Sequence, residues 1–180
     1  MNARNTVAIA AAALLCILGN TVDPAYSRDQ TLQDKLAGTW MLDNLQAVTW
    51  DEEDRNPFGS APKGRMILDQ NGRVTCVIIG SEHVPFLSAD RLTGTAAENQ
   101  SAVQSTQAFF GTYSVNEKDN MVVFHVERSL FPNWDGTNQS LTVTLSGDEL
   151  HQIKAGPHAS TGYAVWKRVK ENQLSQAMTD

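Results

Sequence analysis

Gly38-Thr39-Trp40 and Val165-Trp166-Lys167-Arg168 are the two stretches of this chain that decide its fold. Each lies in a run where apolar and polar residues alternate, which is typical of a β-strand with one buried face. The first stretch places a Trp at the start of the first such run, and the second places a basic residue in the last one. We therefore expect the two ends of the chain to meet along a seam, with Gly38, Trp40 and Arg168 as its structural residues.

Further alternating segments lie between these two ends and are separated by turn signals. They predict eight strands, over residues 36–50, 65–69, 73–79, 110–115, 121–127, 139–145, 149–154 and 163–169. Asn71-Gly72, between the second and third strands, favours a tight hairpin in which both residues take a positive φ. Thr95 and Glu98 form a capping-box pattern, which predicts a short helix running to about Ala108.

Short connections make neighbouring strands antiparallel, so the predicted fold is all-β: an eight-stranded up-and-down meander with one short inserted helix. An open meander would expose two unpaired edges, and closure into an antiparallel barrel removes both. Eight strands enclose an interior wide enough for side chains or for one small ligand. An open sheet folded over the helix is the alternative topology.

The N-terminal residues 1–27 have the features of a secretory signal peptide. Arg4 precedes an uncharged, Ala/Leu-rich run over residues 6–18, and Ala25-Tyr26-Ser27 has the small-x-small pattern of a cleavage site. We therefore expect a secreted or periplasmic protein with one domain over residues 28–170 and a flexible polar tail over 171–180. Cys16 raises a lipoprotein anchor as an alternative, although Leu15 before it is bulky for that processing.

Net charge limits the classes of binding partner, and the cysteine content limits disulfide formation. The net charge of −6 argues against nucleic acid, and against an anionic membrane once the signal peptide is cleaved. Cys76 is the only cysteine after the leader, so no internal disulfide is expected. It lies in an apolar strand, which predicts a buried and inert thiol.

The seam resembles the lipocalin signature, in which the Trp closes the barrel floor beneath an Arg. A cation over an indole face contributes about 0.5–2 kcal/mol and would tie the first strand to the last. Other segments are similar to the lipocalin-like domain family of small bacterial and fungal proteins: Pro62-Lys63-Gly64, Asp69-Gln70-Asn71-Gly72-Arg73, Asp90-Arg91-Leu92-Thr93-Gly94-Thr95, Phe110-Gly111-Thr112-Tyr113 and Glu127-Arg128-Ser129-Leu130-Phe131-Pro132-Asn133-Trp134.

This resemblance covers residues 36–169 and implies a calycin-type β-barrel with a central cavity. Barrels of this kind serve as carriers and, in some branches, as isomerases or cyclases. The secretory leader departs from the many cytosolic-looking members, which argues against an intracellular metabolic role. We expect an exported protein that binds a small hydrophobic molecule in the cavity and needs no cofactor. An interior filled by its own side chains, in a structural or interaction module, is a further possibility.

The alternative function is an isomerase or cyclase that acts on a hydrophobic metabolite by general acid–base catalysis. Its candidate residues are His125 and Glu127, which lie two positions apart on one strand and so point to the same side. This hypothesis requires their side of the strand to face the cavity. If Phe124 and Val126 face inward instead, His125 and Glu127 are ordinary solvated residues.

The candidate ligand-binding residues are Arg65, His83, Phe86, Arg91, Tyr113, Phe131 and Trp134. The aromatic group over 113–134 is expected to line or close an apolar pocket. Arg91, in the loop before the helix, offers a bidentate fork to a carboxylate or carbonyl. Arg65 is a candidate anion anchor on the second strand. Each of these residues also has a structural interpretation as packing, a local ion pair or an exposed side chain.

Motifs for other chemistries are missing from the sequence. The four histidines show no ligand spacing, so no metal site is expected. No serine-hydrolase, P-loop, Cys-x-x-Cys or dinucleotide pattern occurs. Asn99-Gln100-Ser101 and Asn138-Gln139-Ser140 match the glycosylation sequon, which matters only in a eukaryotic secretory pathway.

Overall fold

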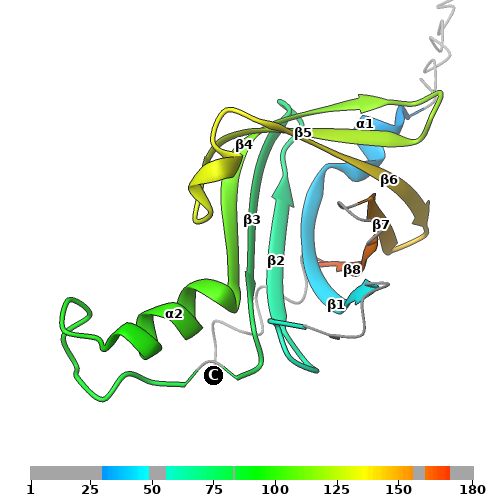
Figure 1. Cartoon of the computed structure of the whole chain (residues 1–180). Coiled ribbons are helices and arrows are strands. Elements are labelled where there is room, and N and C mark those ends of the chain that lie inside the picture. Colours follow the sequence, from blue (N-terminus) through cyan, green and yellow to red (C-terminus); the bar gives the residue numbers. More distant parts are fainter. Residues whose placement is uncertain (1–29, 49–55, 83, 156–160, 171–180) are drawn as a thin grey trace, which may run out of the picture.

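Eight antiparallel strands follow one another in chain order around a closed barrel (Figure 1). The computed structural model describes residues 30–48, 56–82, 84–155 and 161–170. The strands are β1 (Gly38–Val48), β2 (Lys63–Leu68), β3 (Arg73–Ile79), β4 (Thr106–Asn116), β5 (Met121–Ser129), β6 (Asn138–Ser146), β7 (Glu149–Ala155) and β8 (Thr161–Arg168). The predicted all-β up-and-down barrel is confirmed, and the open sheet is wrong because β1 pairs with β8. The predicted signal peptide and C-terminal tail lie outside the described residues.

The seam between β1 and β8 is held by more than the strand ladder. Trp40 lies opposite Arg168, and the guanidinium carbon lies 4.1 Å from the centroid of the Trp40 ring. Arg168 Nη1 donates to the carbonyl of Ala37 at 2.8 Å, and Nη2 donates to the carbonyl of Lys35. A Cβ on Gly38, whose φ is +145°, would lie 2.6 Å from Nη1 of Arg168. Only glycine therefore lets the guanidinium lie across the start of β1.

A short helix, α1 (Leu32–Leu36), covers one end of the barrel and was absent from the predicted elements (Figure 1). Thr31 Oγ1 accepts a hydrogen bond from the Asp34 amide at 3.1 Å, and the Asp34 carboxylate accepts one from the Thr31 amide at 3.1 Å. The Leu36 side chain is fully buried, and its carbonyl accepts the indole N–H of Trp40 at 2.9 Å. So short a helix is not stable alone, and these contacts hold it to the barrel.

A longer helix, α2 (Ala96–Gln104), lies at the opposite end of the barrel and buries none of its residues (Figure 1). The predicted capping box is confirmed: the Glu98 amide donates to Thr95 Oγ1, and the Glu98 carboxylate accepts the Thr95 amide at 2.7 Å. The helix ends at Gln104 rather than near Ala108. The reason is that residues 106–108 pair with β3, which makes β4 longer than predicted.

The hairpin between β2 and β3 is present, but its turn differs from the expected one. Of Asn71 and Gly72, only Gly72 has a positive φ, 80°. The Gly72 amide donates to the carbonyl of Asp69 at 3.1 Å, and Asp69 Oδ1 accepts the amides of Asn71 and Arg73, each at 2.8 Å. The side chain of Asp69 thus stabilises a wider turn in which Asn71 keeps an ordinary φ.

Side chains fill the interior toward α1. The most deeply buried of them include Leu36, Trp40, Leu68, Val74 and Val122. The turn between β4 and β5 reaches α1 at this end, where Glu117 Oε1 accepts the amide of Leu32 at 2.9 Å. Barrel space for a ligand therefore lies toward the other end.

Candidate functional site

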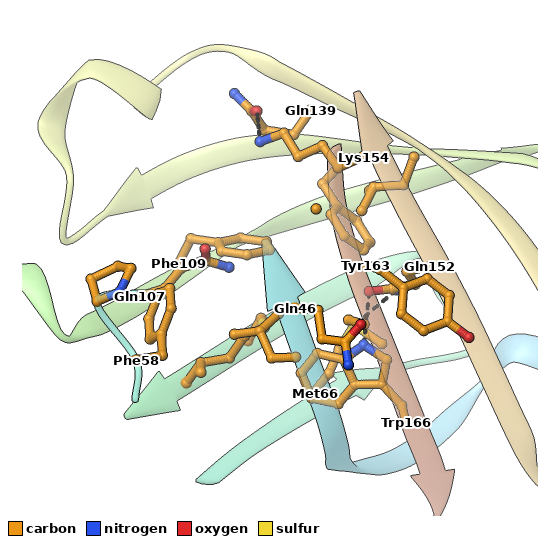
Figure 2. A pocket seen from close by; sticks show the side chains of 18 of the residues that line it. Gln46, Phe58, Met66, Gln107, Phe109, Gln139, Gln152, Lys154, Tyr163 and Trp166 are labelled. Carbon is orange, nitrogen blue, oxygen red and sulfur yellow. Dashed lines mark hydrogen bonds between the residues drawn. The ribbon is translucent and has the colours of Figure 1, made fainter. Parts of the chain in front are cut away.

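A cavity of about 260 Å³ occupies the barrel interior away from α1 (Figure 2). All eight strands contribute to its wall, and most of the side chains are apolar: Leu45, Phe58, Met66, Ile78, Phe109, Phe124, Trp134, Leu141, Ala164 and Trp166. Small-molecule pockets in proteins measure roughly 300–1,000 Å³, so this cavity suits a small ligand. The hypothesis of an interior filled entirely by side chains is therefore wrong.

Alternation on β2 and β3 makes one apolar side of the cavity. Every second residue of both strands is buried, and Met66, Cys76 and Ile78 line the space. Burial raises the pKa of the Cys76 thiol to about 12, because the thiolate would lose its hydration. The thiol therefore stays protonated, as the apolar sequence around it predicts, and offers no nucleophile to the cavity.

An irregularity in β1 redirects its side chains toward the cavity. The pairing of β1 with β8 shifts between Leu42 and Asn44, so that β1 accommodates one extra residue. Strict alternation would place Asn44 on the face of Trp40. Instead Asn44 is exposed, and Leu45 and Gln46 line the cavity.

Gln152 is a buried polar side chain in the cavity wall, 5% exposed. Its Oε1 accepts the indole N–H of Trp166 at 2.8 Å, and its Nε2 lies 3.7 Å from the sulfur of Met66 (Figure 2). A buried indole N–H without an acceptor would cost about 1–3 kcal/mol. The hydrogen bond from Trp166 to Gln152 avoids this cost and links β7 to β8. Sequence reasoning missed Gln152 because polar and apolar residues occupy both faces of β7.

Lys154 is a second polar residue of β7 that lines the cavity. It lies two residues after Gln152, on the same face of the strand. Its ammonium donates to Gln139 Oε1 at 2.6 Å (Figure 2). The same group lies 4.3 Å from the ring centroid of Trp134. Partial burial lowers the pKa of Lys154 because the charged form is less hydrated there. The sequence gives no sign that Lys154 points inward, because the residues on either side of it, Ile153 and Ala155, are the apolar ones.

Among the predicted ligand-binding residues, Trp134 lines the cavity. Phe131 packs edge-on against it, with ring centroids 6.2 Å apart, but is 54% exposed and does not line the space. Tyr113 is buried elsewhere, and its hydroxyl donates to the carbonyl of Asp69 at 2.9 Å, so it packs the filled end of the barrel. The predicted aromatic group therefore contributes one wall residue and one supporting contact.

The remaining predicted contacts lie away from the cavity. Arg65 is exposed on β2 between the inward-facing Gly64 and Met66, so its predicted reach into the interior is wrong. Phe86 is half-buried near Gly94, where an added Cβ would lie 2.5 Å from the Phe86 ring. Arg91 is exposed and does not line the cavity. His83 lies outside the described residues.

His125 and Glu127 face outward, which removes them from the cavity. On β5 the buried side chains include Phe124 and Val126, so the other row points to solvent. Phe124 lines the cavity, whereas neither His125 nor Glu127 does. The inward orientation that acid–base catalysis in the barrel required is therefore wrong.

Across neighbouring strands, His125 binds two other polar side chains. Its Nε2 lies 3.0 Å from Ser114 Oγ, and its Nδ1 lies 2.8 Å from Asn138 Oδ1. Hydroxyl, imidazole and amide thus follow the order of a catalytic triad. They lie on the outer face of the barrel, and none of them lines the described cavity. The arrangement satisfies polar side chains on the sheet surface.

Metal ligands do not gather in the part of the chain that the structure describes. No group of three or more His, Cys, Asp or Glu side chains there is placed to hold an ion. No helix in the described part of the chain has the length and hydropathy of a membrane span.

Comparisons with known proteins give one family match and two distant structural matches. A search of curated proteins finds no match. A redesigned β-barrel of known structure shares 12% identity and a TM-score of 0.43, with 80% of this chain and 100% of that chain covered. A structure described as the REP1-NXSQ fatty acid transporter shares 12% identity and a TM-score of 0.36, with coverage of 76% and 97%. The model of the lipocalin-like domain family matches residues 37–169, nearly the whole barrel, and this chain therefore belongs to that family.

Proposed function

We propose that this protein is an exported carrier that holds a small, largely apolar molecule in its barrel. The observation that carries the proposal is the cavity of about 260 Å³ with an apolar wall built by all eight strands. Water in such a space finds few hydrogen-bond partners, and an apolar molecule that fills it removes apolar surface from water, which favours binding. Membership of the lipocalin-like family supports the same interpretation.

The expected binding free energy comes mainly from apolar contact. Burial of about 300 Å² of ligand surface at about 25 cal/mol per Å² contributes roughly 7 kcal/mol before the costs of association and ordering. Those costs remove part of this gain, so we expect modest affinity and broad tolerance for ligand shape. The polar side chains in the wall set the orientation of the ligand.

A carrier fits the wall chemistry better than the alternative isomerase or cyclase. The thiol of Cys76 stays protonated, with its pKa raised to about 12. Gln152 is engaged with Trp166, and Lys154 with Gln139. The proposed acid–base pair lies on the outer face. No pair of titratable groups with opposed roles meets inside the described part of the cavity.

Export is part of the proposal and rests on the sequence of residues 1–27. A leader of this kind directs the chain across a membrane and is then removed. N-terminal sequencing of the protein recovered from the extracellular or periplasmic fraction tests it. Recovery of the uncleaved chain from the cytosol alone would contradict this part of the proposal.

The test of cargo binding uses a variant that fills the cavity. Native mass spectrometry of protein purified from the producing cell, followed by extraction, detects a retained molecule. The neutral fluorophore 1-aminoanthracene then reports the apolar space in solution. Ala164 is buried and lines the cavity, so Ala164→Phe should abolish fluorophore binding while the fold remains.

Ala108→Phe is the matched control, because Ala108 precedes the buried Phe109 on β4 and points outward. It should leave fluorophore binding unchanged. Equal binding by the wild type and Ala164→Phe would show that the fluorophore binds elsewhere. A wild-type protein that retains no molecule and binds no apolar probe would refute the carrier.

A further inference from the structure

Lys154 is the one charged side chain among the described residues that line the cavity. Its place follows from β7, where Leu150 and Gln152 are buried and the next inward position is Lys154. All other described lining residues are apolar or neutral at physiological pH. The cavity therefore has an apolar wall with a single positive point.

Neutral neighbours hold this ammonium group in place. Gln139 Oε1 accepts from Lys154 Nζ at 2.6 Å, and the Trp134 ring lies beneath it with its centroid at 4.3 Å. Gln139 Nε2 donates to Thr137 Oγ1 at 2.8 Å, and that hydroxyl donates to the carbonyl of Trp134 at 2.8 Å. The chain of contacts orders Lys154 before a ligand arrives, and an ammonium has donors left beyond the one used by Gln139.

Within the described residues, no carboxylate lies within 4.0 Å of the Lys154 ammonium. The ion pairs formed there by Lys or Arg involve other residues: Arg73–Asp69, Arg128–Asp135, Lys167–Asp43, Arg168–Asp148 and Lys170–Asp148. Lys154 is half-buried, and its hydrogen-bond and ring partners are neutral. A partly desolvated charge without a counter-ion is costly, and an anion placed beside it removes that cost.

An aromatic path leads from this charge into the cavity. Trp134 packs edge-on against Phe109, with centroids 6.2 Å apart, and Phe109 packs against Phe124 at 5.5 Å. All three rings line the cavity. A ligand whose anionic end lies at Lys154 would place its apolar body along these rings.

We infer that the cargo is a small apolar molecule with one anionic oxygen group, a carboxylate, which binds the Lys154 ammonium while its apolar body contacts Phe109 and Phe124. The inference rests on the proposed carrier function and specifies its ligand class. Charge-assisted hydrogen bonds to a carboxylate add orientation to an otherwise shape-tolerant pocket. Gln139 and Trp134 act here as positioning residues for Lys154.

The test compares octanoate with octan-1-ol, which have the same chain length and differ in the charged group. Both are titrated by displacement of 1-aminoanthracene, with calorimetry as a second measurement. The wild type should bind octanoate more tightly. Lys154→Met keeps the length of the side chain and removes the charge, so it should weaken octanoate about 10- to 100-fold and leave octan-1-ol unchanged. Lys154→Arg should retain most of the octanoate affinity.

Lys167→Met is the matched control, since Lys167 is exposed on the neighbouring strand β8 and pairs with Asp43. It should change neither affinity. Circular dichroism of each variant shows that it is folded. If the wild type and Lys154→Met bind octanoate equally, or octan-1-ol binds as tightly as octanoate, the inference is overturned while the carrier stands. If neither 1-aminoanthracene nor either ligand binds, the carrier fails and the inference fails with it.

Discussion

Replacement of Arg168 by Met tests whether its side chain, as well as the strand ladder, holds the barrel closed. The guanidinium contributes about 0.5–2 kcal/mol through the Trp40 ring, 4.1 Å away. It also donates to the carbonyls of Ala37 and Lys35. Charged hydrogen bonds contribute about 1.5–3 kcal/mol each when buried, and less here because the side chain is 24% exposed. We expect Arg168→Met to lower the free energy of unfolding by about 2–4 kcal/mol.

Urea unfolding followed by tryptophan fluorescence measures this loss, with far-UV circular dichroism as a second probe. A change of 1 kcal/mol shifts the melting temperature of a domain of this size by about 2–4 °C, so a fall of about 4–16 °C is expected. Lys167→Met is the control one position earlier, because its pair with Asp43 is exposed and should contribute about 0–1 kcal/mol.

Two results would refute this reasoning. One is an equal and small loss for Arg168→Met and Lys167→Met, which would mean that the strand ladder alone holds the seam. The other is a double-mutant cycle with Trp40→Leu in which the coupling energy is near zero, since the ring and the guanidinium would then not interact.

Contacts of three further residues, Cys76, His125 and Gln152, give predictions of their own. Cys76, with a pKa raised to about 12, should resist a thiol reagent at pH 8 in the folded protein and react on unfolding. The unfolded thiol ionises above about pH 8.5 and the folded one does not, so stability should fall as the pH rises through this range; a flat profile would contradict the burial. His125→Ala should leave ligand retention unchanged, because the ring lies on the outer face; loss of the retained molecule by native mass spectrometry would contradict that placement. Gln152→Met should cost about 1–3 kcal/mol in urea unfolding by leaving the Trp166 indole N–H without its acceptor, and an unchanged midpoint would mean that water replaces the amide.

Sequence patterns predicted the barrel because each strand alternates over several residues and closure is the general solution for eight antiparallel strands. The capping box of Thr95 and Glu98 was readable for the same reason, since both groups act within one turn. The end of this helix was predicted wrongly, near Ala108. Residues 106–108 pair with β3 instead, and local helix propensity carries no information about such a long-range contact. α1 also has a cap, Thr31 with Asp34, but so short a helix depends on the barrel it covers.

The binding site was harder to predict than the fold. On β5 both faces carry apolar residues near the start, and only the wholly apolar row of Val122, Phe124 and Val126 marks the inward side. On β7 the inward-facing row itself contains Gln152 and Lys154, so the rule that polar residues face solvent assigns these two side chains to the wrong face. The bulge in β1 moves Leu45 inward through a local irregularity that no periodic rule supplies. Cavity residues are the positions where packing tolerates polar groups, and alternation is weakest there.

The pairing of β1 with β8 also means that the barrel cannot close until its last strand has been synthesised. More than a hundred residues separate Val48 from Thr161, and a ribosome adds about 5–20 residues each second, so the first strand waits several seconds for its partner. During that interval a nascent chain has an open edge that chaperones must shield from aggregation. We therefore expect a stop codon before Thr161 to yield insoluble product even though seven strands are complete.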